Sequence, residues 1–551
     1  MEEIKECLKK EINKLFDVEF EPEVVSAPEN QSADYASNVA MRVAGMLKAR
    51  GEARAPREVA EAIAKEIEAS DLGFSVEVAG PGFLNFIARD EYWKTKLAEM
   101  EADFEKNISC DEYSGKTVIC EFSDPNPFKV LHVGHLYTSI VGDSISRLVE
   151  FAGGRVARAN FGGDVGLHVA KTLWAVMRDK KDTNDIAEIA KCYVDGTRAY
   201  EDDEDAKTEI TKLNKEIYRI AENDVRDTEL AKLYWQGRET SYQYFEDFYK
   251  RVGVKFDKYY PESTVAKRGL SEVKSHIGEV YEESNGAVVF PGEKYDLHTR
   301  VFINAEGLPT YEAKDVGLIF TKWDDFHFDK SIVITGNDII DYMKVVLKSI
   351  SLYAPELVER TKHITHGNVR LPGNEKMSSR KGNFIKAVDV LDTVNKLVDN
   401  EMIAMGAIKY AFLKYKIGGN IEFDAKESVS TTGNSGVYLQ YSAVRAKKIL
   451  KGLSEADEAD FAKWELNENE KKLIAKLAQY GNVLKEALSD FAPHKVANYL
   501  YETAQEFSRF YENVKVAGSE YENERAVLVK AYSDVMAHGL NILGIEVPEE
   551  M

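Results

Sequence analysis

The sequence predicts an α/β protein, with a small α+β region before the central core and an all-helical region after it. The short apolar run at residues 116–122 is rich in β-branched side chains, which is typical of a buried parallel strand. From Gly134 onward, apolar residues follow the spacing of a helix, and alternation of strand and helix predicts a parallel sheet. From about residue 432 to the end, almost every segment has helical periodicity.

The first 110 residues form a separate α+β region. Helical patterns at residues 38–50 and 56–69 precede two strand-like runs at residues 74–78 and 82–87. The segment Gly80-Pro-Gly between these two runs is a typical turn. We therefore expect an N-terminal domain at residues 1–110.

The central region, residues 111–431, is predicted to be a Rossmann-like core. A second strand at residues 155–160 runs into the glycine-rich turn at 162–166. Residues 168–255 are strongly helical and charged, which favours an insertion outside the sheet. Strands then resume at three apolar runs, residues 288–290, 300–303 and 331–335. No Gly-x-Gly-x-x-Gly follows a strand and no Walker loop is present, so neither dinucleotide nor P-loop binding is indicated.

Composition points to a cytoplasmic protein. The chain of 551 residues is 30% charged, and it has no apolar run of the ~20 residues that span a bilayer, so no membrane partner is expected. The first ten residues lack the apolar core of a signal peptide. The four cysteines form no Cys-x-x-Cys pair, which argues against structural zinc and against a disulfide framework.

A net charge of −22 excludes a general nucleic-acid coat, because phosphate binding is driven by lysine and arginine. Cations are nevertheless concentrated in two places. Residues 360–386 contain seven lysines and arginines against the single acid Glu375. A second basic cluster at residues 445–451 follows Tyr438 and Tyr441. These clusters make an RNA partner credible.

The most informative segment is Asn126-Pro-Phe-Lys-Val-Leu-His-Val-Gly-His-Leu-Tyr-Thr138. His132 and His135 lie three residues apart where a helix begins, and helix N-termini attract anions. Two imidazoles there can donate hydrogen bonds to phosphate oxygens. Gly134 lets a flat ring lie against the backbone. The alternative is that the histidines only cap the helix.

A second segment, residues 373–383, favours the phosphate interpretation. It combines three cations with two hydroxyls and flanking glycines, so it can close over a triphosphate and neutralise it. Its core is Lys376-Met377-Ser378-Ser379-Arg380. Together, His-Val-Gly-His and Lys-Met-Ser-Ser-Arg resemble the paired signatures of class I aminoacyl-tRNA synthetases.

The resemblance narrows to the arginyl-tRNA synthetases and extends over essentially the whole chain. The segments that carry it are Asp34–Asn38, Ala79–Phe86, Glu121–Asn126, Asn160–Gly166, Tyr311–Asp315, Gly433–Arg445 and Leu540–Met551. The family implies a class I catalytic core, a leading domain that binds the tRNA elbow and a C-terminal helical bundle (432–551) that binds the anticodon. It implies activation of L-arginine with ATP to arginyl-adenylate, release of pyrophosphate, and transfer of arginine to the terminal ribose of tRNA(Arg).

The resemblance also implies site residues. Glu121, Tyr311 and Asp315 would face the guanidinium, which needs acidic or acceptor groups. Ser123 and Asn126 would hold the substrate's α-amino and carboxylate groups. The ATP site would contain His132, Gly134, His135, Gly162, Gly163, Asp164 and residues 376–379, with Mg²⁺ on the phosphates. Lys376, Ser378 and Arg380 would act in catalysis together with the two histidines. The alternative for Asp315 is that it only caps its helix.

Two departures from the family pattern matter. The fourth position of the usual Lys-Met-Ser-Lys-Ser loop is Ser379 here, and the missing charge is assigned to Lys129, three residues before His132. Family members often have glutamine and histidine near the positions of Asp338 and Asp341, and both of these residues stay unassigned.

For tRNA, the resemblance implies that Tyr438, Tyr441 and Arg445 contact anticodon-loop bases, by stacking that is sequence-tolerant. Met551 would face RNA at the C-terminus, and Asn38, Phe83 and Asn85 would hold the tRNA elbow. The competing interpretation of a tyrosine at helical spacing is core packing. A monomer is expected.

Three rival functions remain to be weighed. A cysteinyl enzyme would need zinc-ligand cysteines, and a glutamyl pocket would need arginines where Glu121 and Asp315 stand. A non-catalytic tRNA-binding relative would be favoured by decay of one signature, whereas both signatures are intact.

Overall fold

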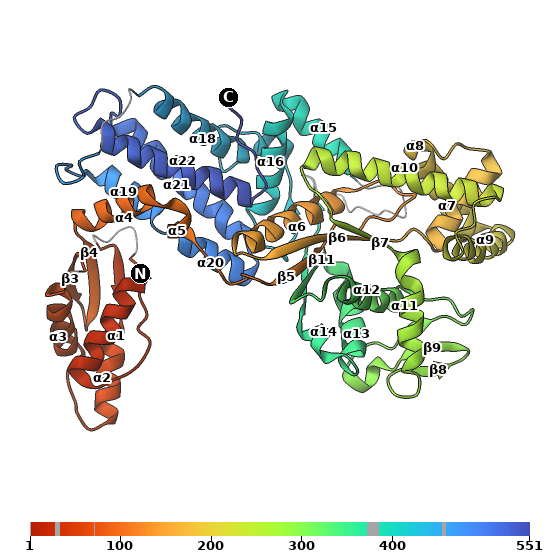
Figure 1. Cartoon of the computed structure of the whole chain (residues 1–551), viewed down its shortest axis with the longest axis horizontal. Coiled ribbons are helices and arrows are strands. Elements are labelled where there is room, and N and C mark those ends of the chain that lie inside the picture. The colour runs from red at the N-terminus through yellow and green to blue at the C-terminus, as the bar shows by residue number, and fades with distance from the viewer. Residues whose placement is uncertain (1, 28–32, 71, 371, 373–384, 454–458) are drawn as a thin grey trace. The chain divides into compact units, whose positions relative to one another are not determined.

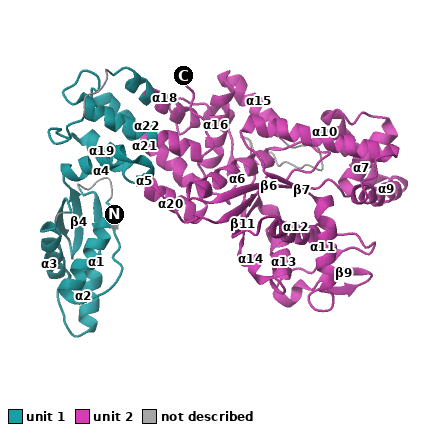
Figure 2. Ribbon diagram, in the orientation of Figure 1, with its two compact units in different colours: residues 1–107, 446–480, 505–534 teal, residues 108–445, 481–504, 535–551 magenta. Residues whose placement is uncertain are grey.

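The computed structural model describes residues 2–27, 33–70, 72–370, 372, 385–453 and 459–551. The chain divides into two compact units (Figure 2). Unit 1 comprises residues 1–107, 446–480 and 505–534. Unit 2 comprises residues 108–445, 481–504 and 535–551. No helix in the described ranges is long and apolar enough to cross a membrane.

Unit 1 contains an antiparallel sheet with strand order β1-β2-β4-β3. Phe74 and Val76 on β3, and Leu84 and Phe86 on β4, alternate with more exposed residues, so one face of the sheet is buried. The predicted helices and strands of this region are confirmed. The elements up to residue 108 are α1 (Glu2–Phe16), β1 (Val25–Ser26), β2 (Tyr35–Ser37), α2 (Val39–Ala49), α3 (Pro56–Glu68), β3 (Phe74–Ala79), β4 (Phe83–Ala88), α4 (Asp90–Ala102) and α5 (Phe104–Ile108).

Unit 2 is built on a five-stranded sheet with the order β12-β11-β5-β6-β7, in which all neighbours are parallel (Figure 1). The strand order reverses between β5 and β11, and open α/β sheets bind ligands at such a point, beyond the carboxyl ends of the strands. The strands are β5 (Thr117–Glu121), β6 (Arg155–Gly162), β7 (Lys258–Pro261), β11 (Lys330–Gly336) and β12 (Thr361–His366).

Residues 168–255, predicted to be a helical insertion, are helical in the structure. The helices of this segment are α7 (Leu167–Asp179), α8 (Ile186–Asp202), α9 (Glu204–Glu222) and α10 (Glu229–Val252). These helices share a buried cluster of their own, which includes Val169, Leu173, Ile210, Ile217 and Tyr234. Residues 168–255 contribute no strand to the parallel sheet.

The strand predictions after the insertion need one refinement. The runs near residues 288 and 300 are strands β9 (Ala287–Phe290) and β10 (Arg300–Ile303), but they pair with β8 (Glu282–Ser284) in a separate antiparallel sheet. Of the three strands predicted after the insertion, only β11 joins the parallel sheet. Strands β7 and β12 are not predicted from the sequence, because each is an edge strand with a polar, partly exposed sequence.

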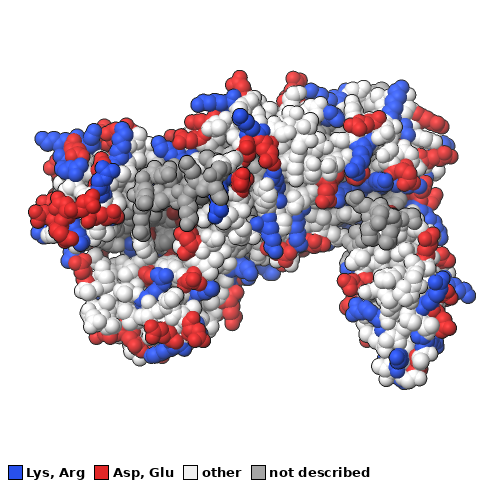
Figure 3. All heavy atoms as spheres, turned by 180° about the vertical axis from the view of Figure 1, so that it is seen from behind, with Lys and Arg blue, Asp and Glu red and all other residues white. Residues whose placement is uncertain are grey.

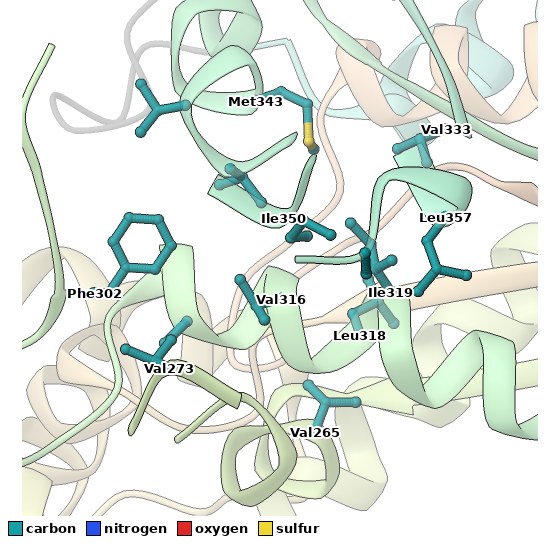
Figure 4. Packing of buried hydrophobic residues seen from close by; sticks show 14 of the residues in the cluster. Val265, Val273, Phe302, Val316, Leu318, Ile319, Val333, Met343, Ile350 and Leu357 are labelled. Carbon is teal, nitrogen blue, oxygen red and sulfur yellow. The ribbon is translucent and has the colours of Figure 1, made fainter. Parts of the chain in front are cut away.

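A buried apolar cluster fixes helix α12 (Tyr311–Phe326) against its neighbours (Figure 4). Val265 of α11 (Glu262–Ser275), Val316 of α12 and Ile350 of α13 (Ile340–Ser351) pack in this cluster. Helices α11 and α12 approach closely, since a Cβ at Gly269 would lie 1.8 Å from the carbonyl oxygen of Ala313. This packing sets the position of Tyr311 and Asp315 at the start of α12.

The last part of the chain is helical, as predicted. Within unit 2, Gly436 at the start of α18 (Gly436–Lys451) allows close packing, since a Cβ there would lie 2.1 Å from the carbonyl oxygen of Gly406. The remaining elements are η1 (Gly292–Tyr295), η2 (Asn337–Ile339), α14 (Pro355–Glu359), β13 (Val369–Arg370), α15 (Ala387–Val398), α16 (Glu401–Leu413), β14 (Ile421–Glu422), α17 (Ala425–Ser428), α19 (Glu468–Leu477), α20 (Tyr480–Asp490), α21 (Pro493–Asn513) and α22 (Glu522–Ile542).

Candidate active site

A cavity of about 870 Å³ lies at the carboxyl ends of the parallel strands of unit 2. Its wall is formed by the ends of β5, β6, β11 and β12 and by the first turn of α6 (Val133–Phe151). The predicted site residues that line it are Glu121, Ser123, Asn126, His132, Gly134, His135, Gly163, Tyr311 and Asp315. Residues from segments far apart in the sequence therefore meet at the switch point of the sheet.

The two histidines form one hydrogen-bonded unit at the start of α6. His132 is the N-cap residue; its Nδ1 accepts a hydrogen bond from the Gly134 N–H at 3.0 Å. His135 Nδ1 accepts from the His132 N–H at 3.1 Å, and the ring centroids lie 3.8 Å apart. A Cβ at position 134 would lie 2.8 Å from His132 Cε1, so glycine is required there. The capping interpretation is thus correct for the two Nδ1 atoms.

Both rings are neutral at physiological pH. Desolvation lowers the pKa of His132 to about 4, with a further contribution from the charge of Lys129. The pKa of His135 is also lowered, first by desolvation and then by its neighbours His132, Lys129 and His366, because a positive charge on His135 would be unfavourable beside them. Since each Nδ1 accepts a hydrogen bond, the proton of each neutral ring sits on Nε2. The pair therefore offers neutral N–H donors beside a helix N-terminus, where phosphate oxygens are stabilised.

Two of the acids in the cavity wall are already paired with buried lysines. Glu121 Oε2 lies 2.5 Å from Lys322 Nζ, and Lys322 also donates to Ser331 Oγ. Glu262 Oε2 lies 2.5 Å from Lys314 Nζ. All four charged side chains are at most 4% exposed. Each pair is therefore compensated within the protein, and its acid has less charge to offer a ligand.

Asp315 lies in the cavity wall and accepts a hydrogen bond from Tyr342 Oη of α13. Desolvation raises the pKa of Asp315 to about 7, and the charge of Glu121 adds to this effect. Tyr311, one helical turn earlier, is 54% exposed, and its ring centroid lies 5.1 Å from Lys314 Nζ. Within the described residues, no lysine or arginine lies within ion-pair distance of Asp315, so this site is suited to a cationic ligand.

The segment after β5 turns sharply beside the cavity. Ser123 and Asp124 both have left-handed backbone angles, with φ of 74° and 50°. Such conformations are strained for residues with side chains and often mark functional sites. Ser123 Oγ lies 2.9 Å from Tyr249 Oη, which fixes the hydroxyl. Asn126 Oδ1 accepts a hydrogen bond from the Gly163 N–H at 2.9 Å. The NH₂ group of the same side chain points away from this bond and can donate to another acceptor.

Asp124 is a cavity acid that the sequence analysis did not assign. Its Oδ1 accepts a hydrogen bond from the Phe161 N–H at 2.8 Å. Desolvation raises the pKa of Asp124 well above its usual value, and the charge of Glu121 raises it further. Asp124 lies within the segment Glu121–Asn126 that carries the resemblance, and this position in the sequence indicates a candidate site residue.

Several predicted residues lie outside the cavity wall. Asp164 is fully buried; it accepts hydrogen bonds from Ser263 and from Arg238 Nε at 2.9 Å, so its carboxylate is committed to the fold. Gly162 packs against the Pro125 carbonyl, where a Cβ would lie 2.5 Å away. Lys129 Nζ lies 4.6 Å from the ring centroid of Tyr193 on α8. Residues 376–380, predicted to act on the triphosphate, are outside the described ranges.

The cavity contains further residues that the sequence alone did not assign. Asp338 lines it, whereas Asp341 is exposed and pairs with Lys344 at 3.0 Å. Tyr342 directly follows Asp341 in the sequence, so it lies next to a position that departs from the family pattern. Thr138 also lines the cavity and ends the segment Asn126–Thr138, whereas no motif marked the other polar lining residues, which include Glu262, Arg300, Thr335, His366 and Asn368.

The residues predicted to contact tRNA lie on the surfaces of both units. On α18, Tyr441 is 37% exposed, and its hydroxyl accepts from Arg445 Nη2 at 3.0 Å. Tyr438 is half-buried; its hydroxyl donates to the Ala504 carbonyl and its ring meets Tyr501 edge-on. Tyr438 therefore packs against the protein, as the core interpretation expects. Tyr441 is exposed, as contact with RNA requires.

In unit 1, the three elbow candidates lie near one another, where β2 ends beside β4. The antiparallel register pairs Ala36 with Asn85 and Ser37 with Leu84, which brings Asn38 opposite Phe83. Phe83 is 41% exposed, and the buried Asn38 Oδ1 has no hydrogen-bond partner in the described structure. Met551, at the C-terminus of unit 2, is half-buried. No group of three or more His, Cys, Asp or Glu among the described residues is placed to hold a metal ion.

Comparison with known proteins agrees with this geometry. The family described as tRNA synthetases class I (R), catalytic domain, matches residues 102–405. The arginyl tRNA synthetase N terminal domain matches residues 2–88, and the DALR anticodon binding domain matches residues 439–551. The first match covers more than half of the chain.

Curated relatives and solved structures extend over the same length. An arginine–tRNA ligase of Clostridium acetobutylicum is 27% identical and aligns with 99% of this chain and 100% of the relative. An arginine–tRNA ligase of Bacteroides fragilis is 27% identical over 90% of this chain and 91% of its own length. The arginyl-tRNA synthetase of Thermus thermophilus shares the fold, with a TM-score of 0.77, 22% identity and complete coverage of both chains. The chain therefore belongs to the arginyl-tRNA synthetase family of class I aminoacyl-tRNA ligases.

Proposed function

We propose that the 870 Å³ cavity joins L-arginine to the α-phosphate of ATP and then transfers the arginyl group to the terminal ribose of tRNA(Arg). The observation that carries this assignment is the pairing of two chemistries in one cavity wall. Neutral imidazole donors lie at the start of α6, whereas Asp124, after β5, and Asp315, in α12, have no lysine or arginine at ion-pair distance among the described residues. A phosphate and a guanidinium are the groups that these two ends would attract.

In this proposal the guanidinium is held chiefly by Asp315. Tyr342 orients the Asp315 carboxylate, and Asp124 supplies a second acid in the cavity wall. Glu121 contributes its second oxygen, because its first is engaged by Lys322. Tyr311 supports this end by covering it with an aromatic ring and a hydroxyl. A planar cation with five donors can use several such acceptors at once.

Ser123 and Asn126 would place the α-amino and carboxylate groups. The Asn126 NH₂ group can donate to the substrate carboxylate, since its Oδ1 is engaged by Gly163. The carboxylate oxygen then attacks the α-phosphate in line, and the bond to pyrophosphate breaks. No side-chain nucleophile is needed, so the rate rests on positioning and on stabilisation of the phosphate charge.

His132 and His135 would donate their Nε2–H groups to phosphate oxygens, and Gly134 and Gly163 would leave room for the nucleotide. Lys129 and residues Lys376, Met377, Ser378, Ser379 and Arg380 complete the proposed phosphate contacts. ATP enters as its Mg²⁺ complex, and the metal supplies charge neutralisation at the phosphates. Gly162 and Asp164 would act indirectly, by shaping the turn beside the nucleoside.

For tRNA, we propose that Tyr441 and Arg445 contact the anticodon loop, that Tyr438 supports them from the helix interior, and that Met551 lies nearby. Asn38, Phe83 and Asn85 would receive the tRNA elbow. We also propose that the protein acts as a monomer. We also propose a cytoplasmic location, because four scattered cysteines without a Cys-x-x-Cys pair suit a reducing compartment.

The test is ATP–pyrophosphate exchange, run with and without tRNA, with arginine as the amino acid. Citrulline is the matched control, because it keeps the shape of arginine and replaces the guanidinium by a neutral urea group. We expect exchange with arginine and none with citrulline, cysteine or glutamate. Exchange with citrulline at the same rate, or no exchange with arginine in either arm, would refute the proposal.

A further inference from the structure

A second cavity, of about 460 Å³, lies in unit 2 and shares no lining residue with the catalytic one. Three separate segments form its wall: β12, the loop after α16 and the start of α21. Strand β12 connects the two cavities, since Thr365 lines the second and the next residue, His366, lines the first. A ligand in the second cavity therefore lies against a strand of the catalytic sheet.

The wall of this second cavity is basic. Lys362, Lys416 and Lys495 each come from a different segment, and Asp490 is the one acid in the wall. Lys495 pairs with Asp490 at 2.9 Å and with Glu486 at 3.3 Å, so its charge is compensated within the protein. Among the described residues, no acid lies within ion-pair distance of Lys362 or Lys416.

Such a concentration of cations is unusual in this chain. Its net charge is −22, and acidic and basic side chains are mixed over the face shown in Figure 3. Lysines scattered on a solvated surface need no explanation. Here two lysines from distant parts of the sequence, Lys362 and Lys416, line one hollow without an acidic partner among the described residues, and an anion bound between them would offset their repulsion.

The start of α21 adds to the attraction for an anion. This helix of 21 residues begins at Pro493, so His494 and Lys495 lie in its first turn, where the helix dipole is positive. His494 Nδ1 is buried and has no hydrogen-bond partner in the described structure. The other histidine of the wall is engaged, because His363 Nε2 lies 2.8 Å from Thr335 Oγ1. An oxygen acceptor in the cavity would satisfy His494.

We propose that this second cavity binds a backbone phosphate of the tRNA and holds the RNA beside the catalytic sheet. The inference rests on the proposed function. Lysines act as point charges and read no base, which suits a phosphodiester contact that positions a nucleic acid. Lys362 and Lys416 are exposed at the rim, so the bound phosphate remains part of a larger, solvated polyanion.

The test uses the full chain with Lys362→Ala, Lys416→Ala and the double variant. Lys267→Ala is the matched control, since Lys267 is an exposed lysine of α11 that lines neither cavity. We expect the double variant to raise the KM for tRNA roughly tenfold and to lower the slope of log K against log salt by about one to two. Exchange at saturating tRNA and the melting temperature should be unchanged.

Inorganic phosphate is the second probe. It tests whether the cavity is a site for a free small anion instead of a site for a phosphate of the tRNA backbone. Displacement of phosphate by tRNA from the wild type, and loss of phosphate binding in the double variant, would support the proposal. Phosphate binding that is lost in the double variant while the KM for tRNA and the salt slope stay at wild-type values would overturn it in favour of a small-anion site. A wild type that charges tRNA(Arg), with a double variant that matches it in every assay, would overturn the inference and leave the proposed function intact.

Discussion

Glu121 and Lys322 form a buried ion pair with 2.5 Å between Oε2 and Nζ, although they are 201 residues apart in the sequence. The pair joins the end of β5 to helix α12, the two elements that carry the predicted guanidinium site. Glu121 is therefore a structural acid as well as a candidate ligand. Asp315 is the acid on which arginine selection is expected to depend most.

The ion pair itself can be tested through stability. Lys322→Met should lower the free energy of unfolding by about 3–5 kcal/mol, because it leaves a buried carboxylate without its partner. Glu121→Gln combined with Lys322→Met should recover much of that loss. Chemical denaturation of the single and double variants measures both effects. Equal instability of the two variants would show that the charge pair is not the cause.

Asp315→Ala should weaken arginine recognition far more than ATP use. Loss of the carboxylate facing a guanidinium costs about 3–5 kcal/mol, so the KM for arginine should rise by more than about a hundredfold. Steady-state kinetics with each substrate varied in turn will measure this. Asp341→Ala is the matched control, because Asp341 is an exposed aspartate near the same site but outside the cavity wall. An unchanged KM for arginine in Asp315→Ala would remove Asp315 from the pocket.

Arginine binding should depend on pH. Burial raises the pKa of Asp315 to about 7, so below that pH the carboxyl group is protonated and neutral. A guanidinium favours the ionised form, so binding releases a proton. The KM for arginine should therefore fall as pH rises toward 7, by up to about tenfold per unit, and level off above it. In Asp315→Asn this dependence should disappear. A flat profile in the wild type would contradict the assignment.

Lys129→Ala should reduce adenylate formation by about a hundredfold, the effect of losing one preorganised charge. Lysine at position 379, in the Ser379→Lys variant, should restore part of the rate. Exchange kinetics of the single and double variants give the comparison. Lys191→Ala, an exposed lysine on the same helix as Tyr193, is the control. If Lys129→Ala has no effect, Arg380 or Lys381 becomes the better candidate for this charge.

Tyr438 and Tyr441 should respond differently to substitution by alanine. Tyr438 is half-buried against α21, so Tyr438→Ala should lower the melting temperature. Tyr441 is exposed, so Tyr441→Ala should leave stability unchanged and weaken tRNA binding by about 1–3 kcal/mol. Thermal melts and the KM for tRNA separate the two effects. Normal charging by Tyr441→Ala at low tRNA concentration would rule out base stacking by this residue.

Local sequence predicted most of the secondary structure and one end of the active site. The spacing of His132 and His135 and the glycine between them are local features, and the structure places them at a helix start as expected. The edge strands β7 and β12 were missed, because an edge strand needs no continuous apolar pattern. Their place in the sheet depends on neighbours distant in the chain.

The sequence by itself determined the chemistry that is available: paired histidines, a set of carboxylates and a family signature along the whole chain. Only the tertiary structure decided which carboxylates remain for a ligand. Lys322 and Lys314 compensate Glu121 and Glu262, whereas Asp315 accepts a hydrogen bond from the Tyr342 hydroxyl and has no cationic partner among the described residues. The physical reason is that the pKa and charge of a buried acid depend on desolvation and on neighbours, and three-dimensional packing sets both.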